Sequence, residues 1–220
     1  MFRQELFIQT SWYIVCTVYG MMDFGGDMKK EPTRVRLLQV SRNLFLKQGY
    51  SETGLNQIVE EAKTVKASLY QHFSSKEMLG KEVLRIYSDE NLTLLRSLMK
   101  RNPKPLDFVK AWVRILSREA RESQLYGCGM ANFRAQIAPH ELEILKEIEK
   151  IANNTIDCLE DYLEESVENG HLPSKVDCRL LAKHLFFVYE GVLQGYRLLD
   201  DRRSLDELYR MAESLIPTPK

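Results

Sequence analysis

The sequence has few of the residues that build metal centres, disulfide frameworks or hydrolytic active sites. Its 220 residues include four cysteines and four histidines. The cysteines form no CxxC pair and no histidine lies at ligand spacing, so neither a zinc site nor a disulfide framework is indicated. None of the histidines has a serine, cysteine or carboxylate partner at a motif spacing. We therefore expect no metal, cofactor or catalytic residue, and a reducing, cytoplasmic location.

The sequence also lacks a run long enough to span a membrane and any strand-like alternation. Residues 12–22 are apolar, but eleven residues are too few to cross a bilayer. They also lack the basic start and cleavage site of a secretory signal. Three interpretations of the N-terminal extension, residues 1–27, stay open: an upstream extension of the reading frame, a membrane-surface tether, or an extra packing helix. We expect no membrane partner for the rest.

The chain has no net charge, because 31 basic residues balance 31 acidic ones. The balance hides an asymmetry along the chain. Residues 28–81 contain ten Lys or Arg and five Glu, so this segment carries +5 and the remainder −5. A basic segment in an otherwise acidic chain is expected of a protein that binds double-stranded DNA through one region only.

Residues 55–79 contain two short helix-period segments separated by a tight joint. The first follows Thr53, which we expect to be its N-cap. Four residues of the second fall on one arc of a helical wheel and are expected in the core: Val65, Leu69, His72 and Phe73. The opposite face and its flanks hold Ala67, Tyr70, Gln71, Lys66 and Ser68. The last four supply a phenol, an amide, a cation and a hydroxyl. These groups suit phosphate oxygens and base edges, so the pattern predicts a DNA-reading helix-turn-helix. An aromatic helix packed in a core is the alternative.

A longer helix is predicted over residues 75–99. Ser74 and Glu77 have capping-box spacing, and Lys76 lies in the first turn. The N–H groups of this turn and the ammonium group suit a phosphate. Because this helix starts at the DNA surface and continues into the body, it would link the two halves of the protein.

A wider set of residues around this unit carries a family resemblance: Gly49, Tyr50, Thr53, Ile58, Ala62, Lys66, Leu69, Tyr70, His72, Phe73, Ser75, Lys76 and Glu77. It resembles the signature of TetR-type (tetracycline-repressor-like) transcriptional regulators. The resemblance implies an all-α homodimer, with a helix-turn-helix DNA-binding domain over residues 28–76 and a helical ligand-binding and dimerisation domain over residues 77–220. It also implies two sets of DNA contacts: Thr53, Lys66, Tyr70, His72 and Lys76 on phosphates, and Ala67, Ser68 and Gln71 near base edges.

Two residues depart from the family pattern. Lys63 stands where the family has a glycine in the turn, and Val65 stands where a serine caps the recognition helix. Thr64 is expected to cap the helix instead and is included among the DNA-binding residues. This leaves the start of the helix, and so the base-facing register, open.

Helix-period patterns fill the rest of the chain, over residues 33–48, 108–123, 141–168, 177–199 and 204–215. The last two carry more apolar surface than one subunit needs. We expect them to form a four-helix bundle with a second copy across a two-fold axis, through Leu181, Leu185, Val188, Val192, Gly195, Leu199, Leu208 and Leu215.

An effector pocket is expected among the helices of the second domain, where aromatic residues are concentrated. Apolar walls with a few polar groups are typical of small-molecule sites. The candidates are Tyr87, Phe108, Trp112, Tyr126, Cys128, Asn132, Phe133, Arg134, His184, Phe187 and Tyr189. Simple core packing is the alternative for each aromatic residue. Cys128 lies between two glycines, and it is either a sensor of oxidants or a small packing residue.

These patterns predict a ligand-responsive, DNA-binding transcriptional regulator. It would be a repressor that a small effector releases from a palindromic operator. Two alternatives stay open: a constitutive architectural DNA-binding protein without a ligand, and a helical enzyme.

Overall fold

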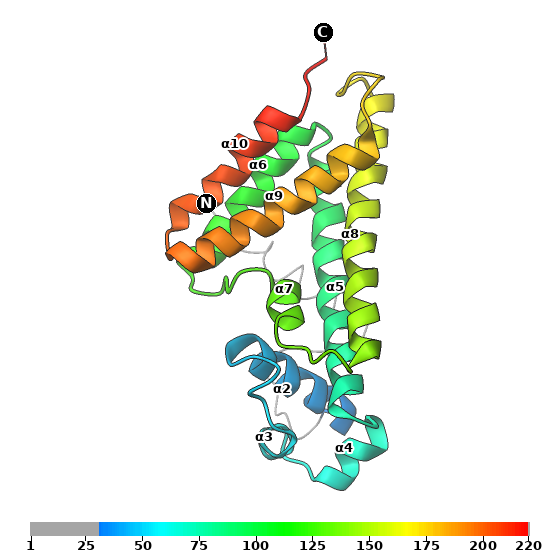
Figure 1. Cartoon of the computed structure of the whole chain (residues 1–220), viewed down its shortest axis with the longest axis vertical. Helices are drawn as coiled ribbons and strands as arrows, with labels where there is room; N and C mark the ends of the chain where they lie inside the picture. Colours follow the sequence, from blue (N-terminus) through cyan, green and yellow to red (C-terminus); the bar gives the residue numbers. More distant parts are fainter. Residues whose placement is uncertain (1–30, 220) are drawn as a thin grey trace. The chain divides into compact units, whose positions relative to one another are not determined.

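The computed structural model describes residues 31–219, so the N-terminal extension lies outside the described residues. This part of the chain contains helices and no strand, which confirms the predicted all-α class (Figure 1). The elements are α2 (Thr33–Lys47), α3 (Leu55–Glu61), α4 (Lys66–His72), α5 (Lys76–Arg101), α6 (Pro105–Arg121), α7 (Gly129–Arg134), α8 (Leu142–Glu168), α9 (Cys178–Leu199), the 3-10 helix η2 (Arg202–Asp206) and α10 (Glu207–Leu215). No helix of residues 31–219 is long and apolar enough to cross a membrane.

Two compact units divide the described chain. The first unit is formed by residues 31–94 together with 133–148, and the second by residues 95–132 together with 149–219. Helices α5 and α8 contribute residues to both. The sequence-based boundary was a single cut after residue 76, whereas the segment 133–148 belongs to the compact unit of the helix-turn-helix.

In the first unit, α2 packs against both α3 and α4. Its buried face is formed by Leu37, Leu38, Val40, Ser41, Leu44 and Phe45. The Arg36 guanidinium donates to the carbonyl oxygen of Ala62 at 3.0 Å, which ties α2 to the end of α3. Gly49 follows α2 with a φ of 97°. This left-handed conformation favours glycine, and a Cβ there would also displace the end of the Gln136 side chain, whose amide oxygen would lie 2.4 Å away.

The segment 133–148 is joined to the helix-turn-helix by rings and charges. The Phe133 ring lies 4.8 Å from that of Tyr50 and 5.5 Å from that of Phe45. Lys81 and Arg85 of α5 form ion pairs with glutamates of α8, at 2.8 and 2.9 Å respectively. The second of these glutamates, Glu147, is buried. A mixed apolar and charged contact therefore holds this segment within the first unit.

The second unit is built on apolar packing. Helix α10 packs against α6 and α9, and η2 packs against both as well. A row of rings crosses its core: Phe108 lies 5.1 Å from Tyr162 and 5.5 Å from Trp112, and Trp112 stacks on Tyr189 at 4.4 Å. Asp177 caps α9 by accepting the Leu180 N–H at 2.9 Å.

Candidate nucleic-acid interface

The exposed side of α4 carries the groups expected at a DNA surface. Leu69 is fully buried, and Phe73, the residue that ends the helix, is 3% exposed. The residues predicted to face DNA on this helix are exposed or half-buried: Lys66, Ala67, Ser68, Tyr70, Gln71 and His72. This arrangement leaves one ammonium, one amide and one phenol free to meet phosphate oxygens or base edges.

Two residues expected in the core of this helix are exposed instead. Val65 is 60% exposed, and the His72 side chain is also exposed. Val65 is not helical, since it is the N-cap residue with φ −127° and ψ 157°. An extended residue does not follow the 100° step of a helical wheel, and the predicted core arc is therefore wrong at this position.

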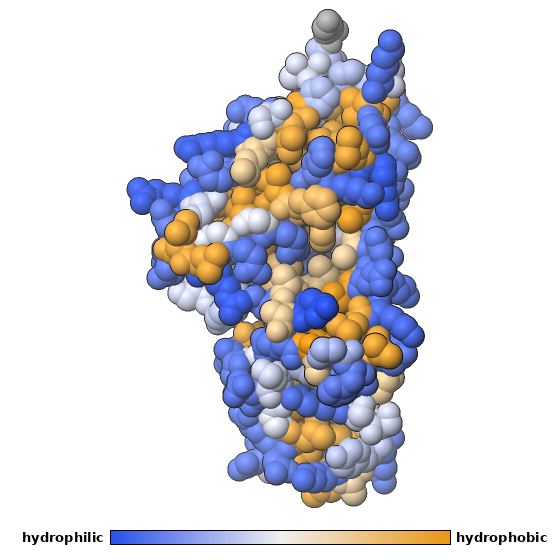
Figure 2. All heavy atoms as spheres, viewed as in Figure 1, coloured by the Kyte–Doolittle hydropathy of each residue, from blue (hydrophilic) through white to orange (hydrophobic). Residues whose placement is uncertain are grey.

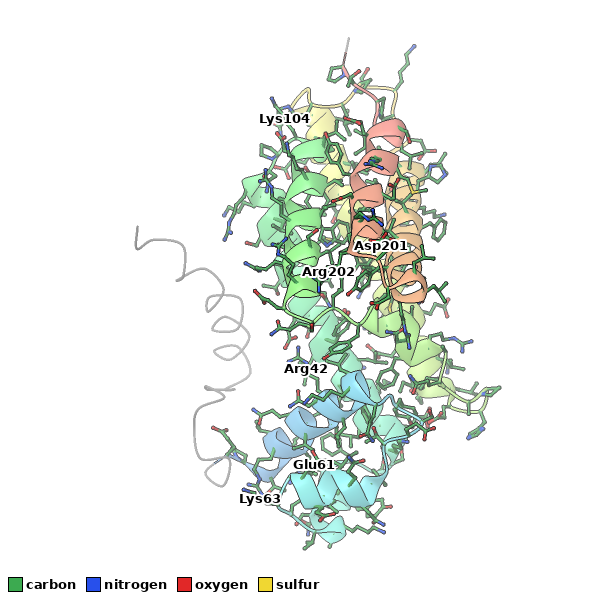
Figure 3. All side chains as sticks on the ribbon, turned by 90° about the vertical axis from the view of Figure 1, so that its left-hand side faces the viewer. Arg42, Glu61, Lys63, Lys104, Asp201 and Arg202 are labelled. Atoms are coloured by element: carbon green, nitrogen blue, oxygen red, sulfur yellow. The ribbon has the colours of Figure 1, made fainter. Side chains whose placement is uncertain are left out.

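The turn between α3 and α4 contains Lys63 in the left-handed region, with φ 51°. Figure 3 labels this residue near Glu61, in the lower part of the view. Lysine carries a Cβ that glycine lacks, so this conformation is strained. The Thr64 N–H donates to the carbonyl oxygen of Val59 at 2.9 Å, and the Arg36 guanidinium reaches the carbonyl oxygen of Lys63 at 3.5 Å. These contacts hold the turn in place.

The two predicted threonine caps do not form. Gly54 is the N-cap of α3 and Val65 that of α4, and neither makes a side-chain cap hydrogen bond. The Thr53 side chain is fully buried and its hydroxyl donates to the carbonyl oxygen of Gly49 at 2.6 Å. Burial removes Thr53 from the surface that was predicted to meet phosphates. Thr64 is half-buried in the turn.

Helix α5 is capped by Ser75 rather than Ser74. The Ser75 hydroxyl accepts the Met78 N–H at 3.1 Å, which is the N-cap to N3 geometry. Glu77 does not complete a capping box, because its carboxylate accepts the N–H of Glu143 at 2.9 Å, at the start of α8. A carboxylate at a helix N-terminus is favoured by the helix dipole.

Lys76 is held at the base of this surface by an aromatic ring. Its ammonium lies 4.4 Å from the centre of the Tyr50 ring and 3.4 Å from the carbonyl oxygen of Ser51. Burial lowers the pKa of Lys76, while the carboxylates of Glu141 and Glu52 act in the opposite direction. The Tyr50 hydroxyl donates to the Glu141 carboxylate at 2.5 Å, and its pKa is raised by burial and by this hydrogen bond. These contacts hold the ammonium group of Lys76 at a fixed place within the first unit.

The predicted pocket residues fall in different units. Tyr87, Phe133 and Arg134 belong to the first unit, and the remaining eight belong to the second. Phe133 packs against Phe45 and Tyr50. Tyr126, His184 and Phe187 are exposed, whereas Phe108 and Trp112 lie in the ring stack. Of the pocket candidates in the second unit, Phe108, Trp112 and Cys128 are buried and Tyr189 is half-buried.

Cys128 is buried and pairs with a glutamate that sequence reasoning missed. Its thiol lies 3.1 Å from the Glu190 carboxylate. Burial raises the pKa of Cys128, and the Glu190 charge raises it further. Burial also raises the pKa of Glu190, although the hydrogen bond from Cys128 opposes that shift. The thiolate is therefore disfavoured, which is the opposite of what activation by a helix N-terminus would produce.

Asn132, another pocket candidate, accepts a hydrogen bond from Arg197.

The predicted dimer residues lie mostly inside their own subunit. Leu181, Leu185, Val192 and Leu208 are each at most 7% exposed, and Val188, Gly195 and Leu215 are half-buried. Only Leu199 is well exposed. The exposed apolar stripe of α9 consists of different residues, Leu180, Phe187 and Leu198, with the open surface of Gly191 between them. Figure 2 shows apolar atoms over α9 and at its C-terminal end.

Two family models match the chain in order. The model described as "Bacterial regulatory proteins, tetR family" matches residues 37–83, and "Tetracyclin repressor-like, C-terminal domain" matches residues 105–212. The chain belongs to the TetR family. It is a DNA-binding transcriptional regulator, as the sequence predicted.

Full-length relatives of this TetR-family regulator share about a quarter of its residues. The HTH-type transcriptional repressor DhaR of Mycobacterium sp. (strain GP1) is 26% identical, over 87% of this chain and 96% of DhaR. The HTH-type transcriptional repressor NemR of Escherichia coli (strain K12) is 24% identical, over 85% and 95% respectively. Similar folds occur in reduced E. coli NemR, with a TM-score of 0.74, 22% identity and coverage of 86% and 99%. The TetR-family regulator CifR, complexed with double-strand operator DNA, has a TM-score of 0.69, 20% identity and coverage of 81% and 94%.

Proposed function

We propose that this regulator is a cytoplasmic repressor without catalytic activity, and that α4 is its recognition helix in the major groove. The observation that carries this proposal is the exposed face of α4, where Lys66, Tyr70 and Gln71 stand on a helix anchored by Leu69. Recognition helices of helix-turn-helix proteins read base edges with their N-terminal residues. DhaR and NemR are repressors by name, and CifR has been seen on operator DNA.

The exposed stripe of α9 supplies the dimer contact in this proposal. Phe187 is 61% exposed and Leu198 is 82% exposed, which is an unfavourable arrangement for a subunit alone in water. A two-fold axis would place each stripe against its copy, because the same surface is used by both partners. The two recognition helices would then meet two half-sites of a palindrome one helical turn or more apart.

The effector is taken up by the second unit in this proposal. Trp112 and Tyr189 supply stacked apolar surface, and Cys128 and Glu190 supply a thiol and a carboxyl group in the same unit. A few polar groups within an apolar wall are the usual composition of a small-molecule site. Binding energy of about 1–3 kcal/mol coupled to the DNA-binding state is enough to release an operator.

The test is a selection of binding sites from a random duplex library with the purified full-length protein. A palindromic motif, bound by two copies of the chain, is the expected result. A reporter placed under that motif should be repressed by the protein and restored by an effector that also changes Trp112 fluorescence. Binding without sequence preference, or without any effector response, would favour the constitutive architectural protein instead.

A further inference from the structure

Val65 is an unusual residue for the place it occupies. It is the N-cap of α4, is 60% exposed, and makes no side-chain cap hydrogen bond. Branched apolar residues are among the least favoured at an N-cap, because they cannot accept the free N–H groups of the first turn. Its isopropyl group therefore contributes little to α4 and little to the core of the first unit.

The packing of α4 does not need this side chain. Leu69 and Phe73 anchor the helix with 0% and 3% exposure. The preceding turn holds the strained Lys63, so two unfavourable local features lie within three residues. Residues that destabilise the local structure, such as a strained backbone or a poor helix cap, are concentrated at sites where proteins bind their partners. A contact made only in the complex would account for an apolar group held at this tip.

Ala67 adds a second apolar group on the same exposed turn. Lys66 lies between Val65 and Ala67, and all three side chains are exposed. Among the groups that base pairs present in the major groove, the thymine 5-methyl is the apolar one. An apolar side chain that faces the groove is therefore matched to thymine. Gln71, exposed on the next turn, has the amide that pairs with adenine.

We propose that Val65 and Ala67 are specificity-determining residues that contact thymine methyl groups in the operator half-site. This inference rests on the proposed function, because it requires α4 to lie in the major groove. It goes further by assigning the base and the atom that two side chains recognise. The selected half-site should then contain thymines whose methyl groups contribute to affinity, next to an adenine read by Gln71.

The experiment compares thymine with uracil, which differs only by the missing methyl group. Each thymine of the selected half-site is replaced in turn by deoxyuridine, and affinity is measured by fluorescence anisotropy at fixed salt. Losing one methyl contact should weaken wild-type binding about fourfold at one or two positions, the equivalent of about 0.8 kcal/mol. Uracil at other thymines should leave affinity unchanged.

Matched variants connect the methyl group to the side chain. In Val65→Ser, the thymine-to-uracil ratio at one position should fall from about four to about one, since the facing methyls are gone. Val65→Thr, which keeps one methyl, should retain part of the ratio. Serine is a favoured N-cap residue, so the variant should fold and melt no lower than wild type. Ala67→Gly should lower the thymine-to-uracil ratio to about one at a different position. Leu142→Ser, which changes an exposed leucine of α8, should lower the ratio at no position.

Each outcome bears on the proposal separately. A protein that selects no motif from the library overturns both the proposed function and this inference. A protein that selects a motif, yet binds the uracil duplexes as tightly as the thymine ones, overturns only the inference. The inference is also overturned if Val65→Ser, shown to be folded by circular dichroism, keeps the full thymine-to-uracil ratio.

Discussion

The two units of this regulator expose different kinds of side chain. Each is also stabilised internally by different interactions. The first unit presents Lys66, Tyr70 and Gln71 on α4, and ion pairs hold its segment 133–148. The second unit presents an apolar stripe on α9 and is filled by stacked rings. Contacts with DNA, a polyanion, depend on hydrogen bonds and charge, whereas contacts between two copies of a chain depend more on apolar burial. The two surfaces therefore match the two partners that we propose, DNA for the first unit and a second copy of the chain for the second.

The sharpest way to break this comparison is to place a charge on the apolar stripe. Phe187→Asp should abolish the dimer, because an unpaired carboxylate buried in the contact costs about 3–5 kcal/mol. Operator affinity should fall with it, since each copy would hold one half-site alone. Sedimentation measures the first effect and anisotropy the second. Leu142→Asp is the matched control, since Leu142 is 58% exposed on another helix, and it should stay dimeric. A dimer of unchanged affinity in Phe187→Asp would place the interface elsewhere.

A buried polar contact of the first unit should matter more than a similar one at the surface. Tyr50→Phe removes the hydroxyl that donates to Glu141, and a hydrogen bond to a charged group contributes about 1.5–3 kcal/mol. Urea unfolding should show a loss of this size. Tyr209→Phe removes a hydroxyl bonded to Glu213 at the surface, at 3.2 Å, and should cost much less. Equal losses in the two variants would mean that burial of the Tyr50 contact has no special role.

The exposed face of α4 should separate affinity from specificity. Gln71→Ala should cost about 1–3 kcal/mol at the selected operator and little on unrelated DNA, because a base contact carries sequence information. Lys66→Ala should weaken both DNAs alike and lower the slope of log affinity against log salt by about 1. Anisotropy titrations at several salt concentrations measure both. An unchanged slope in Lys66→Ala, together with an altered sequence preference, would exchange the two roles.

The smallest expected effect concerns the buried carboxyl of the second unit. Burial raises the pKa of Glu190 above its usual value near 4.5, so the folded state holds this proton more tightly than the unfolded chain. The resulting stabilisation is present at acidic pH and is lost as pH rises through the raised pKa. Glu190→Gln should therefore raise the melting temperature at pH 7 relative to wild type, with less gain near pH 4. A gain independent of pH would show that Glu190 does not titrate in this way.

The sequence correctly predicted buried residues of the helix-turn-helix where the backbone is a regular helix. The helix expected over residues 33–48 forms as α2 with an apolar buried face, and Leu69 and Phe73 anchor α4 as expected. The prediction failed where the backbone leaves the helix. Val65 is extended, so the helical wheel assigned it to the core although 60% of it is exposed. Caps failed for a similar reason, because Thr53 donates to Gly49 and leaves the N-cap to Gly54.

The dimer face shows a different limit of periodicity. Helix α9 carries apolar residues on most of its circumference, from Leu180 and Leu181 through Phe186 and Phe187 to Leu198. Several different sets of these apolar residues fit a repeat of about 3.5 residues, so periodicity does not single out one of them. Of the set predicted from sequence, Leu181, Leu185 and Val192 are buried in the second unit, and a neighbouring set of apolar residues is exposed.

From the amino-acid sequence we could predict the helical elements, the basic helix-turn-helix, the family and the class of function. These depend on local periodicity and on motif residues at fixed spacing, which are properties of the chain read in order. The folded structure was needed to show that Glu190 contacts Cys128, that Tyr50 contacts Lys76 and Glu141, and which side of α9 stays exposed. Such pairs lie tens of residues apart, and their burial and pKa values depend on which neighbours packing brings to them.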